Sequence, residues 1–134
     1  MQRGTCKVVA DVVKNRLYVV LQGSLSAAEI RAVAGQVTDQ MNRLRPGFDV
    51  VTDLSAANGT DTEGLEELTR LQGYVATHGM RRAVRVVPQA FVAMLQMWRT
   101  SRQFGYSVDL ALSITEAQKI LDDPRARSAD VPQM

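Results

Sequence analysis

The amino-acid sequence predicts an α/β domain built on a mostly parallel five-stranded sheet. Two observations lead to this fold class. Short apolar runs rich in β-branched residues alternate along the chain with longer segments in which apolar residues recur every three or four positions, as they do in amphipathic helices. Residues that start and stop helices stand at the borders of those longer segments. The predicted order is ββαβαβαβα, with an antiparallel hairpin at the N-terminal edge of the sheet and about four helices.

The chain begins with the two strands of the predicted hairpin. Apolar, β-branched residues dominate from Cys6 to Val13 and again from Arg16 to Leu21. The polar pair Lys14-Asn15 separates the two runs, and asparagine tolerates the positive φ that a tight turn requires. We therefore expect the first strand to run antiparallel to the second.

A first helix is predicted from a capping box and an apolar stripe. Ser26 and Glu29 are spaced so that each side chain can accept a hydrogen bond from the other residue's backbone N–H group. Pro46-Gly47 ends the helix. The residues of its buried stripe lie three or four positions apart: Ile30, Val33, Val37, Met41 and Leu44.

The segment from Phe48 to Leu54 predicts a central strand, because its apolar residues suit burial on both faces. Residues 56–59, Ala-Ala-Asn-Gly, are expected to form a loop. Thr60 and Glu63 then repeat the capping pattern at the start of a second helix, which Gly79 ends. The apolar stripe of that helix comprises Leu65, Leu68, Leu71 or Gln72, and Val75.

The remaining elements continue the alternation. We expect a strand at 81–87, a helix from Pro88 to about residue 103, a strand at 107–112, and a last helix that Ser113 caps and that carries the apolar residues Ala117, Ile120 and Leu121. If each new strand joins the same edge of the sheet, the right-handed crossovers place their helices on one face and leave the other thinly covered. A doubly wound sheet is the alternative. Residues 1–123 are expected to form one domain, and residues 124–134 a flexible tail.

Composition limits the classes of function. Apolar residues make up 46% of the chain and charged residues 22%, as in an ordinary globular domain. The net charge of +2 comes from basic and acidic residues spread along the chain, which predicts no nucleic-acid partner. The single cysteine, Cys6, excludes an intramolecular disulfide. We expect a cytoplasmic protein without a membrane span, because no signal-peptide pattern and no apolar run of about 18 residues is present.

No residue pattern indicates a metal, a cofactor or an activated nucleophile. His78 is the only histidine, and no phosphate-binding glycine motif is present. Asp53 ends the central strand, where open α/β sheets place functional groups. Alternatively, its carboxylate accepts N–H groups of the following turn. Helix capping accounts for the residue types at Thr60, Asp61 and Glu63, and partner recognition is the second interpretation.

Two short motifs surround the end of the central strand. Asp53-Leu54-Ser55 is followed by Asp61-Thr62-Glu63-Gly64-Leu65, whose aspartate lies eight residues after the first. Together with the predicted element order from Lys7 to Leu121, these motifs resemble the anti-sigma-factor antagonist (STAS) superfamily. Its SpoIIAA-like fold is a βα superhelix with D-L-S at the end of a strand and D-S-S-G-L at the next helix N-terminus. The resemblance implies a non-enzymatic regulator whose partners are a kinase and an anti-sigma-like factor.

In that superfamily the second serine of D-S-S-G-L is phosphorylated as a switch, and the partners dock around it. The resemblance places Glu63 at that position, so we expect the ordinary serine switch to be absent. A carboxylate would hold a permanent negative charge there, smaller than the charge of about −1.5 to −2 on a phosphoryl group. Thr62, at the first serine position, is the candidate substitute phosphoacceptor.

The leading hypothesis from the sequence is an interaction module that binds a protein partner and needs no cofactor. Its expected binding residues are Asp53, Ser55, Asn58, Thr60, Asp61, Thr62, Glu63 and Gly64. A third hypothesis is an enzyme that uses Asp53 and either Asp61 or Glu63 as an acid and base pair, but the sequence supplies no third group to polarise its substrate.

The alternative hypothesis is a carrier or sensor of a small apolar or anionic ligand, held between the sheet and the methionine-rich helix after Pro88. If exposed, residues of that helix would form a patch for a ligand or for a homodimer: Val92, Met94, Met97 and Trp98.

Overall fold

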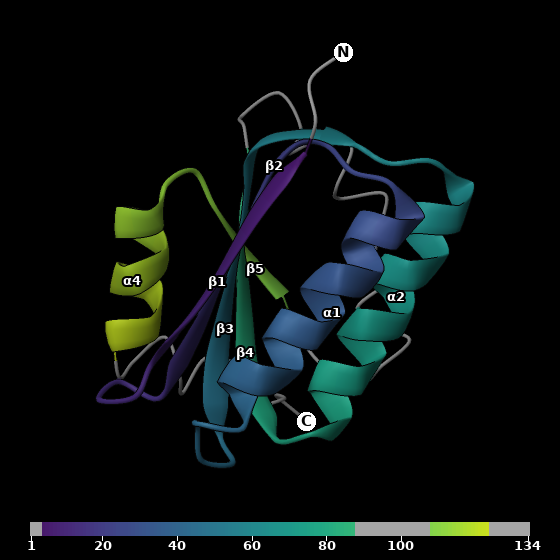
Figure 1. Cartoon of the computed structure of the whole chain (residues 1–134). Helices are drawn as coiled ribbons and strands as arrows, with labels where there is room; N and C mark the ends of the chain where they lie inside the picture. The colour runs from purple at the N-terminus through teal and green to yellow at the C-terminus, as the bar shows by residue number, and fades with distance from the viewer. Residues whose placement is uncertain (1–3, 88–107, 124–134) are drawn as a thin grey trace, which may run out of the picture.

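The sheet grows from one edge to the other in chain order, β1-β2-β3-β4-β5, and helices pack on both of its faces (Figure 1). This computed structural model describes residues 4–87 and 108–123. β1 and β2 are antiparallel, and the other three neighbouring pairs are parallel. The predicted α/β class, the mostly parallel five-stranded sheet and the antiparallel hairpin at its N-terminal edge are therefore confirmed.

The hairpin joins β1 (Thr5–Asp11) to β2 (Arg16–Ser24). Asn15 adopts the predicted positive φ, 56°, and the Lys14 N–H group donates to Asp11 Oδ1 at 3.1 Å. The prediction that the first strand reaches Val13 was wrong. Asp11 pairs with Arg16 and closes the ladder, so the two valines before Lys14 lie in the turn, where Val13 is 91% exposed.

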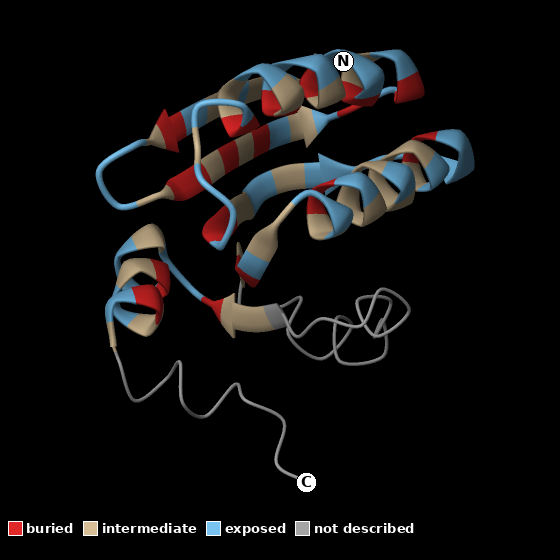
Figure 2. Cartoon of the chain, turned by 90° about the horizontal axis from the view of Figure 1, so that it is seen from below, coloured by how far each residue is buried: buried red, intermediate tan, exposed pale blue. Residues whose placement is uncertain are grey.

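α1 (Ala27–Met41) begins with the predicted capping box, since Ser26 Oγ accepts from the Glu29 N–H group and Glu29 Oε1 accepts from the Ser26 N–H group. Its buried side faces the sheet (Figure 2). Four residues of the predicted stripe are buried within the helix: Ile30, Val33, Val37 and Met41. The fifth, Leu44, lies beyond the helix end and packs at the margin of the same core.

β3 (Phe48–Gly59) is longer than the sequence predicts. Residues 56–59 were expected to form a loop, and this prediction was wrong, because β2 continues to Ser24 and pairs with Ala56, Ala57 and Gly59. Ladder pairing thus overrides the low strand propensity of Gly59. Two register shifts interrupt the ladder, between Val20 and Gln22 and between Gly23 and Ser24.

The second half of the fold contains α2 (Thr62–Thr77), β4 (Met80–Val86), β5 (Val108–Ala111) and α4 (Ile114–Asp122). Both described crossover helices, α1 and α2, lie on one face of the sheet, as expected when each strand joins the same edge, and α4 covers part of the other face (Figure 1). The described residues contain three helices. The predicted helix from Pro88 and the predicted tail at 124–134 lie outside them.

β3 separates two apolar cores. Phe48 and Val50 belong to the larger core beneath α1 and α2, whereas Val51 belongs to the smaller core beneath α4. The smaller core is completed by strand residues and by two residues of α4: Val84, Val86, Ala111, Ala117 and Leu121. Burial of β3 on both faces follows from this alternation, as its sequence predicts.

Buried arginines tie the N-terminal ends of the strands together. Arg16 of β2 is 2% exposed and donates from Nη2 to Asp122 Oδ1 of α4 at 2.8 Å. Its Nε and Nη1 atoms are buried without a hydrogen-bond partner in the described part of the chain. Arg82 of β4 donates to Asp109 Oδ2 of β5 at 2.6 and 2.9 Å. Asp122 is therefore the group that compensates the buried Arg16 charge.

We predict that Asp122→Asn lowers the free energy of unfolding by about 2 kcal/mol at pH 7, because it leaves a buried guanidinium without a charged acceptor. Urea denaturation measures the change. Asp39→Asn, on the exposed side of α1, is the matched control and should change stability by less than about 0.5 kcal/mol. Equal effects of the two substitutions would contradict the role given to Asp122.

The same pair predicts a pH dependence. The hydrogen bond from Arg16 lowers the pKa of Asp122 below its ordinary value of 3.8. A carboxyl group with a lowered pKa in the folded state contributes stability that is complete above pH 3.8 and is lost as the pH falls through the lower folded value. The stability difference between wild type and Asp122→Asn should therefore shrink below that pH in acid titrations.

Candidate functional site

The candidate site lies where β3 ends and α2 begins. Asp53 is half-buried, and its Oδ1 atom accepts from the Ser55 N–H group at 2.9 Å and from the Ser55 hydroxyl at 2.6 Å. The structure thus brings these two predicted site residues together. It also favours the local interpretation of Asp53, because that carboxylate already accepts donors from the residue two positions later.

The start of α2 differs from the sequence prediction by one residue. Asp61 is the N-cap, and its Oδ1 atom accepts from the Gly64 N–H group at 2.8 Å. Thr60 was predicted to cap the helix with Glu63, and this was wrong. Its hydroxyl instead donates to the Leu25 carbonyl oxygen at 2.7 Å, which ties the start of α2 to the segment that precedes α1.

The first turn of α2 presents two exposed side chains. Thr62 is exposed, and 69% of the Glu63 side chain is exposed. Glu63 Oε1 lies 3.8 Å from Arg31 Nη1 of α1, a long ion pair between two exposed groups. The same Arg31 atom lies 3.1 Å from Glu67 Oε1, which Arg70 Nη1 also contacts at 3.1 Å. Arg31 therefore offsets part of the acidic charge of this turn, and Arg70 offsets the charge of Glu67 farther along α2.

Sequence reasoning missed the contribution of α1. Arg31 lies outside the apolar stripe predicted for α1, and no pattern in the sequence shows that this side of α1 reaches α2. Glu67 and Arg70 carry a weak signal, because opposite charges three residues apart on one helix attract each other. Their link to Arg31 depends on how the two helices pack, and periodicity within one helix does not reveal it.

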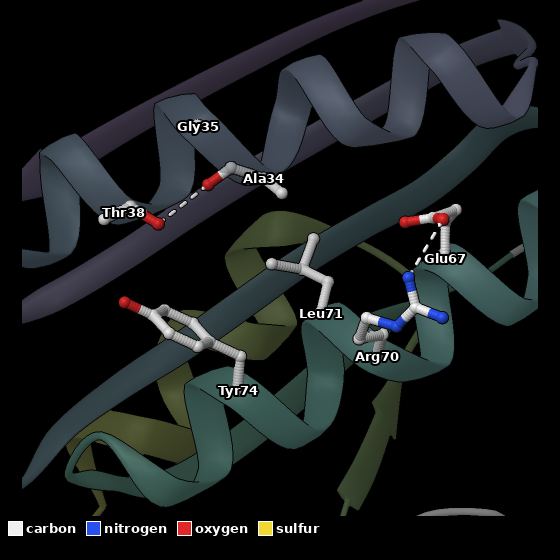
Figure 3. A pocket seen from close by; sticks show the side chains of 7 residues that line it. All are labelled: Ala34, Gly35, Thr38, Glu67, Arg70, Leu71 and Tyr74. Carbon is white, nitrogen blue, oxygen red and sulfur yellow. Dashed lines mark hydrogen bonds and ion pairs between the residues drawn. The ribbon is translucent and has the colours of Figure 1, made fainter.

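An open groove of about 330 Å³ runs between α1 and α2. Small residues of α1 face Leu71 and Tyr74 of α2, and the Glu67–Arg70 pair stands at one end of the groove (Figure 3). This volume is at the lower limit of the roughly 300–1,000 Å³ of ordinary ligand pockets. The α1 residues that line it are Ala34, Gly35 and Thr38.

Several sequence expectations concern other regions. Val92, Met94, Met97 and Trp98 lie outside the described residues, so the expected dimer or ligand patch remains a prediction. Within residues 4–87 and 108–123, no group of three histidine, cysteine, aspartate or glutamate side chains is arranged to hold a metal ion. No helix of the same residues is long and apolar enough to cross a membrane.

Comparison with known proteins identifies the fold. No family model matches the sequence, and no curated protein matches it. Among solved structures, an uncharacterised protein with a SpoIIAA-like fold from Shewanella loihica PV-4 is similar, with a TM-score of 0.67 and 13% identity over 90% of this chain and 95% of that one. An anti-sigma factor antagonist from Mycobacterium paratuberculosis has a TM-score of 0.58 and 17% identity over the same shares of the two chains.

A third similar structure is the anti-sigma factor antagonist SpoIIAA in its unphosphorylated form. Its TM-score is 0.50, with 16% identity over 86% of this chain and 94% of that one. The likeness to all three structures extends along nearly the whole of each chain. The predicted resemblance to SpoIIAA-like proteins is therefore confirmed at the level of the fold.

Gly64 is a packing constraint at this site. A Cβ atom at this position would collide with the Thr60 hydroxyl, which the Leu25 carbonyl holds in place, and would lie 3.2 Å from Ile30 Cδ1. We predict that Gly64→Ala lowers the free energy of unfolding by about 1–2 kcal/mol, because overpacking exceeds the gain in helix propensity. Chemical denaturation measures the change.

Gly35 of α1 supplies the matched control, because a Cβ atom there would meet open space. Gly35→Ala should raise the free energy of unfolding by up to about 1 kcal/mol. If both substitutions changed the free energy of unfolding in the same direction, the contact with Thr60 would not be what limits position 64 to glycine.

Proposed function

We propose that this chain, a protein with the SpoIIAA-like fold, is a non-enzymatic regulatory module that binds a protein partner through the end of β3 and the first turn of α2. The observation that carries the proposal is the 69% exposure of Glu63, the residue at the switch position of the superfamily that the chain resembles. Thr62 beside it is exposed as well. An anti-sigma-like factor or a related kinase is the partner class that this resemblance favours.

The electrostatics of the first turn of α2 suit a fixed negative charge. The N-terminal end of a helix carries a partial positive charge, which stabilises Asp61 and Glu63 there. Arg31 holds Glu63 only at a long distance between exposed groups, so the carboxylate can exchange this contact for a basic group of a partner at little cost. In this proposal Glu63 replaces a reversible switch with a permanent charge.

The geometry gives little support to an acid–base enzyme at the same site. The Asp53 carboxylate accepts two hydrogen bonds from Ser55, and the Asp61 carboxylate accepts the Gly64 N–H group. Both carboxylates thus serve the local backbone structure. A general base must instead reach the proton of a substrate.

We predict that Glu63→Arg abolishes capture of the specific partner from a lysate of the native organism, because it reverses the charge at the centre of the proposed contact. Affinity capture followed by mass spectrometry compares the variant with wild type. Glu66→Arg is the matched control, since Glu66 is exposed on the same helix and the substitution changes the net charge equally. Capture of the same proteins by all three baits would overturn the assignment of the site.

Thr62 remains the proposed substitute phosphoacceptor. Its side chain is exposed, whereas the nearby Thr60 hydroxyl is bonded to the Leu25 carbonyl oxygen. Incubation of the chain with native lysate and Mg-ATP should therefore yield a phosphopeptide modified at Thr62 and not at Thr60, and Thr62→Val should remove it. Absence of phosphate from Thr62 while other threonines of the chain are modified would exclude this role.

A further inference from the structure

Within residues 4–87 and 108–123, the last part of β3 is a strand edge with a ladder on one side only. β4 pairs with β3 from Phe48 to Asp53, whereas β2 pairs with β3 as far as Gly59. We call residues 54–59 the β3 edge. In a parallel ladder alternate peptide groups point to opposite sides, so the groups of the β3 edge that point away from β2 have no ladder partner in the described part of the chain. Ser55, Ala56, Asn58 and Gly59 are exposed.

In the described part of the chain, the β3 edge has less protection than the N-terminal edge of the sheet, although Asp53 Oδ1 accepts from its Ser55 N–H group at 2.9 Å. On β1, Lys7 is exposed, and the Ala10 N–H group donates to Gln40 Oε1 of α1 at 3.2 Å. Lysine and a covering side chain are devices that prevent an edge from pairing with another chain. The β3 edge has the sequence Leu-Ser-Ala-Ala-Asn-Gly, with no charge, no proline and mostly small side chains.

The β3 edge also runs directly into the proposed binding site. It ends one residue before Thr60, and the exposed carboxylates of Asp61 and Glu63 follow it on α2. The two register shifts in the β2–β3 ladder concern this stretch of β3, and bulges of this kind re-aim strands next to functional sites.

We propose that the β3 edge binds an extended segment of the partner protein by strand addition, and this inference rests on the proposed function. Unpaired N–H and C=O groups at a strand edge are complementary to one kind of ligand, another extended backbone. The first turn of α2, with Asp61 and Glu63, follows the β3 edge. It selects a basic side chain at whichever end of the partner segment lies next to α2. The partner segment is therefore short, extended and free of proline where it pairs, with lysine or arginine next to Glu63.

Phage-displayed random heptapeptides provide the probe. Selection on the full chain should enrich proline-poor peptides with a basic residue, and a synthetic copy of one should slow amide hydrogen exchange within residues 54–59. N-methylation of the peptide amides that face the β3 edge should weaken binding about tenfold or more, because each loses a hydrogen bond, whereas N-methylation of the intervening amides should not.

Ala56→Lys tests the β3 edge by a change in the protein and not in the peptide. It adds a lysine to the edge, as Lys7 protects β1. It should weaken peptide binding about tenfold, while Ala32→Lys, the same change at an exposed position of α1, should leave binding unchanged. Thermal denaturation shows that both variants fold. The proposal is overturned if no peptide is enriched, if protection appears in the α1–α2 groove and not at 54–59, or if N-methylation acts equally at every position.

The outcomes separate this inference from the proposed function. If Glu63→Arg abolishes partner capture but the captured partner leaves exchange at residues 54–59 unchanged, strand addition is wrong and the regulatory module stands. If peptides pair with the β3 edge while Glu63→Arg captures the same proteins as wild type, strand addition stands and the role of Glu63 is wrong.

Discussion

The parallel pairing of β2 with β3 is the interaction on which the rest of the structure depends. It places β3 in the middle of the sheet, where both of its faces are buried, and it continues beyond the end of β4 to Gly59. A backbone hydrogen bond from Leu25 to the Gly59 carbonyl oxygen and the Thr60 side-chain bond to Leu25 then fix where α2 begins. The β2–β3 ladder, which begins at the Arg16–Asp49 pair, thus positions the exposed turn that contains Thr62 and Glu63.

The two ends of the sheet use charged residues differently. At the N-terminal ends of the strands, arginine–aspartate pairs join separate elements: Arg16 with Asp122, Arg81 with Asp49, and Arg82 with Asp109. At the other end, Asp53 and Asp61 accept hydrogen bonds from residues two or three positions later in the chain. The first arrangement joins elements that are distant in sequence. The second shapes a surface segment, beside which 69% of the Glu63 side chain is exposed.

Most of the fold could be predicted because local patterns and tertiary contacts agree. Apolar spacing, Ser26 and Ser113 at helix starts, and Gly79 after α2 each carry their signal within a few residues. The failures arose where a distant segment decides. The strand conformation of 56–59 depends on β2, and the shift of the N-cap from Thr60 to Asp61 depends on the Leu25 carbonyl oxygen. Arg31 and the groove beside it depend on helix packing, which the sequence of a single helix does not contain.

The strand order has a consequence for how the chain acquires its structure. Every ladder of the described sheet joins strands that are consecutive in the sequence, so each strand needs only the preceding strand and the connection between them in order to pair. The three parallel ladders must still close a crossover connection before they form, which costs loop-closure entropy and makes them slower to form than the hairpin. Because each strand pairs with the one before it, the sheet can assemble during synthesis from the N-terminal hairpin onward. α4 packs on the sheet after β5 has paired, when Asp122 accepts the hydrogen bond from the buried guanidinium of Arg16.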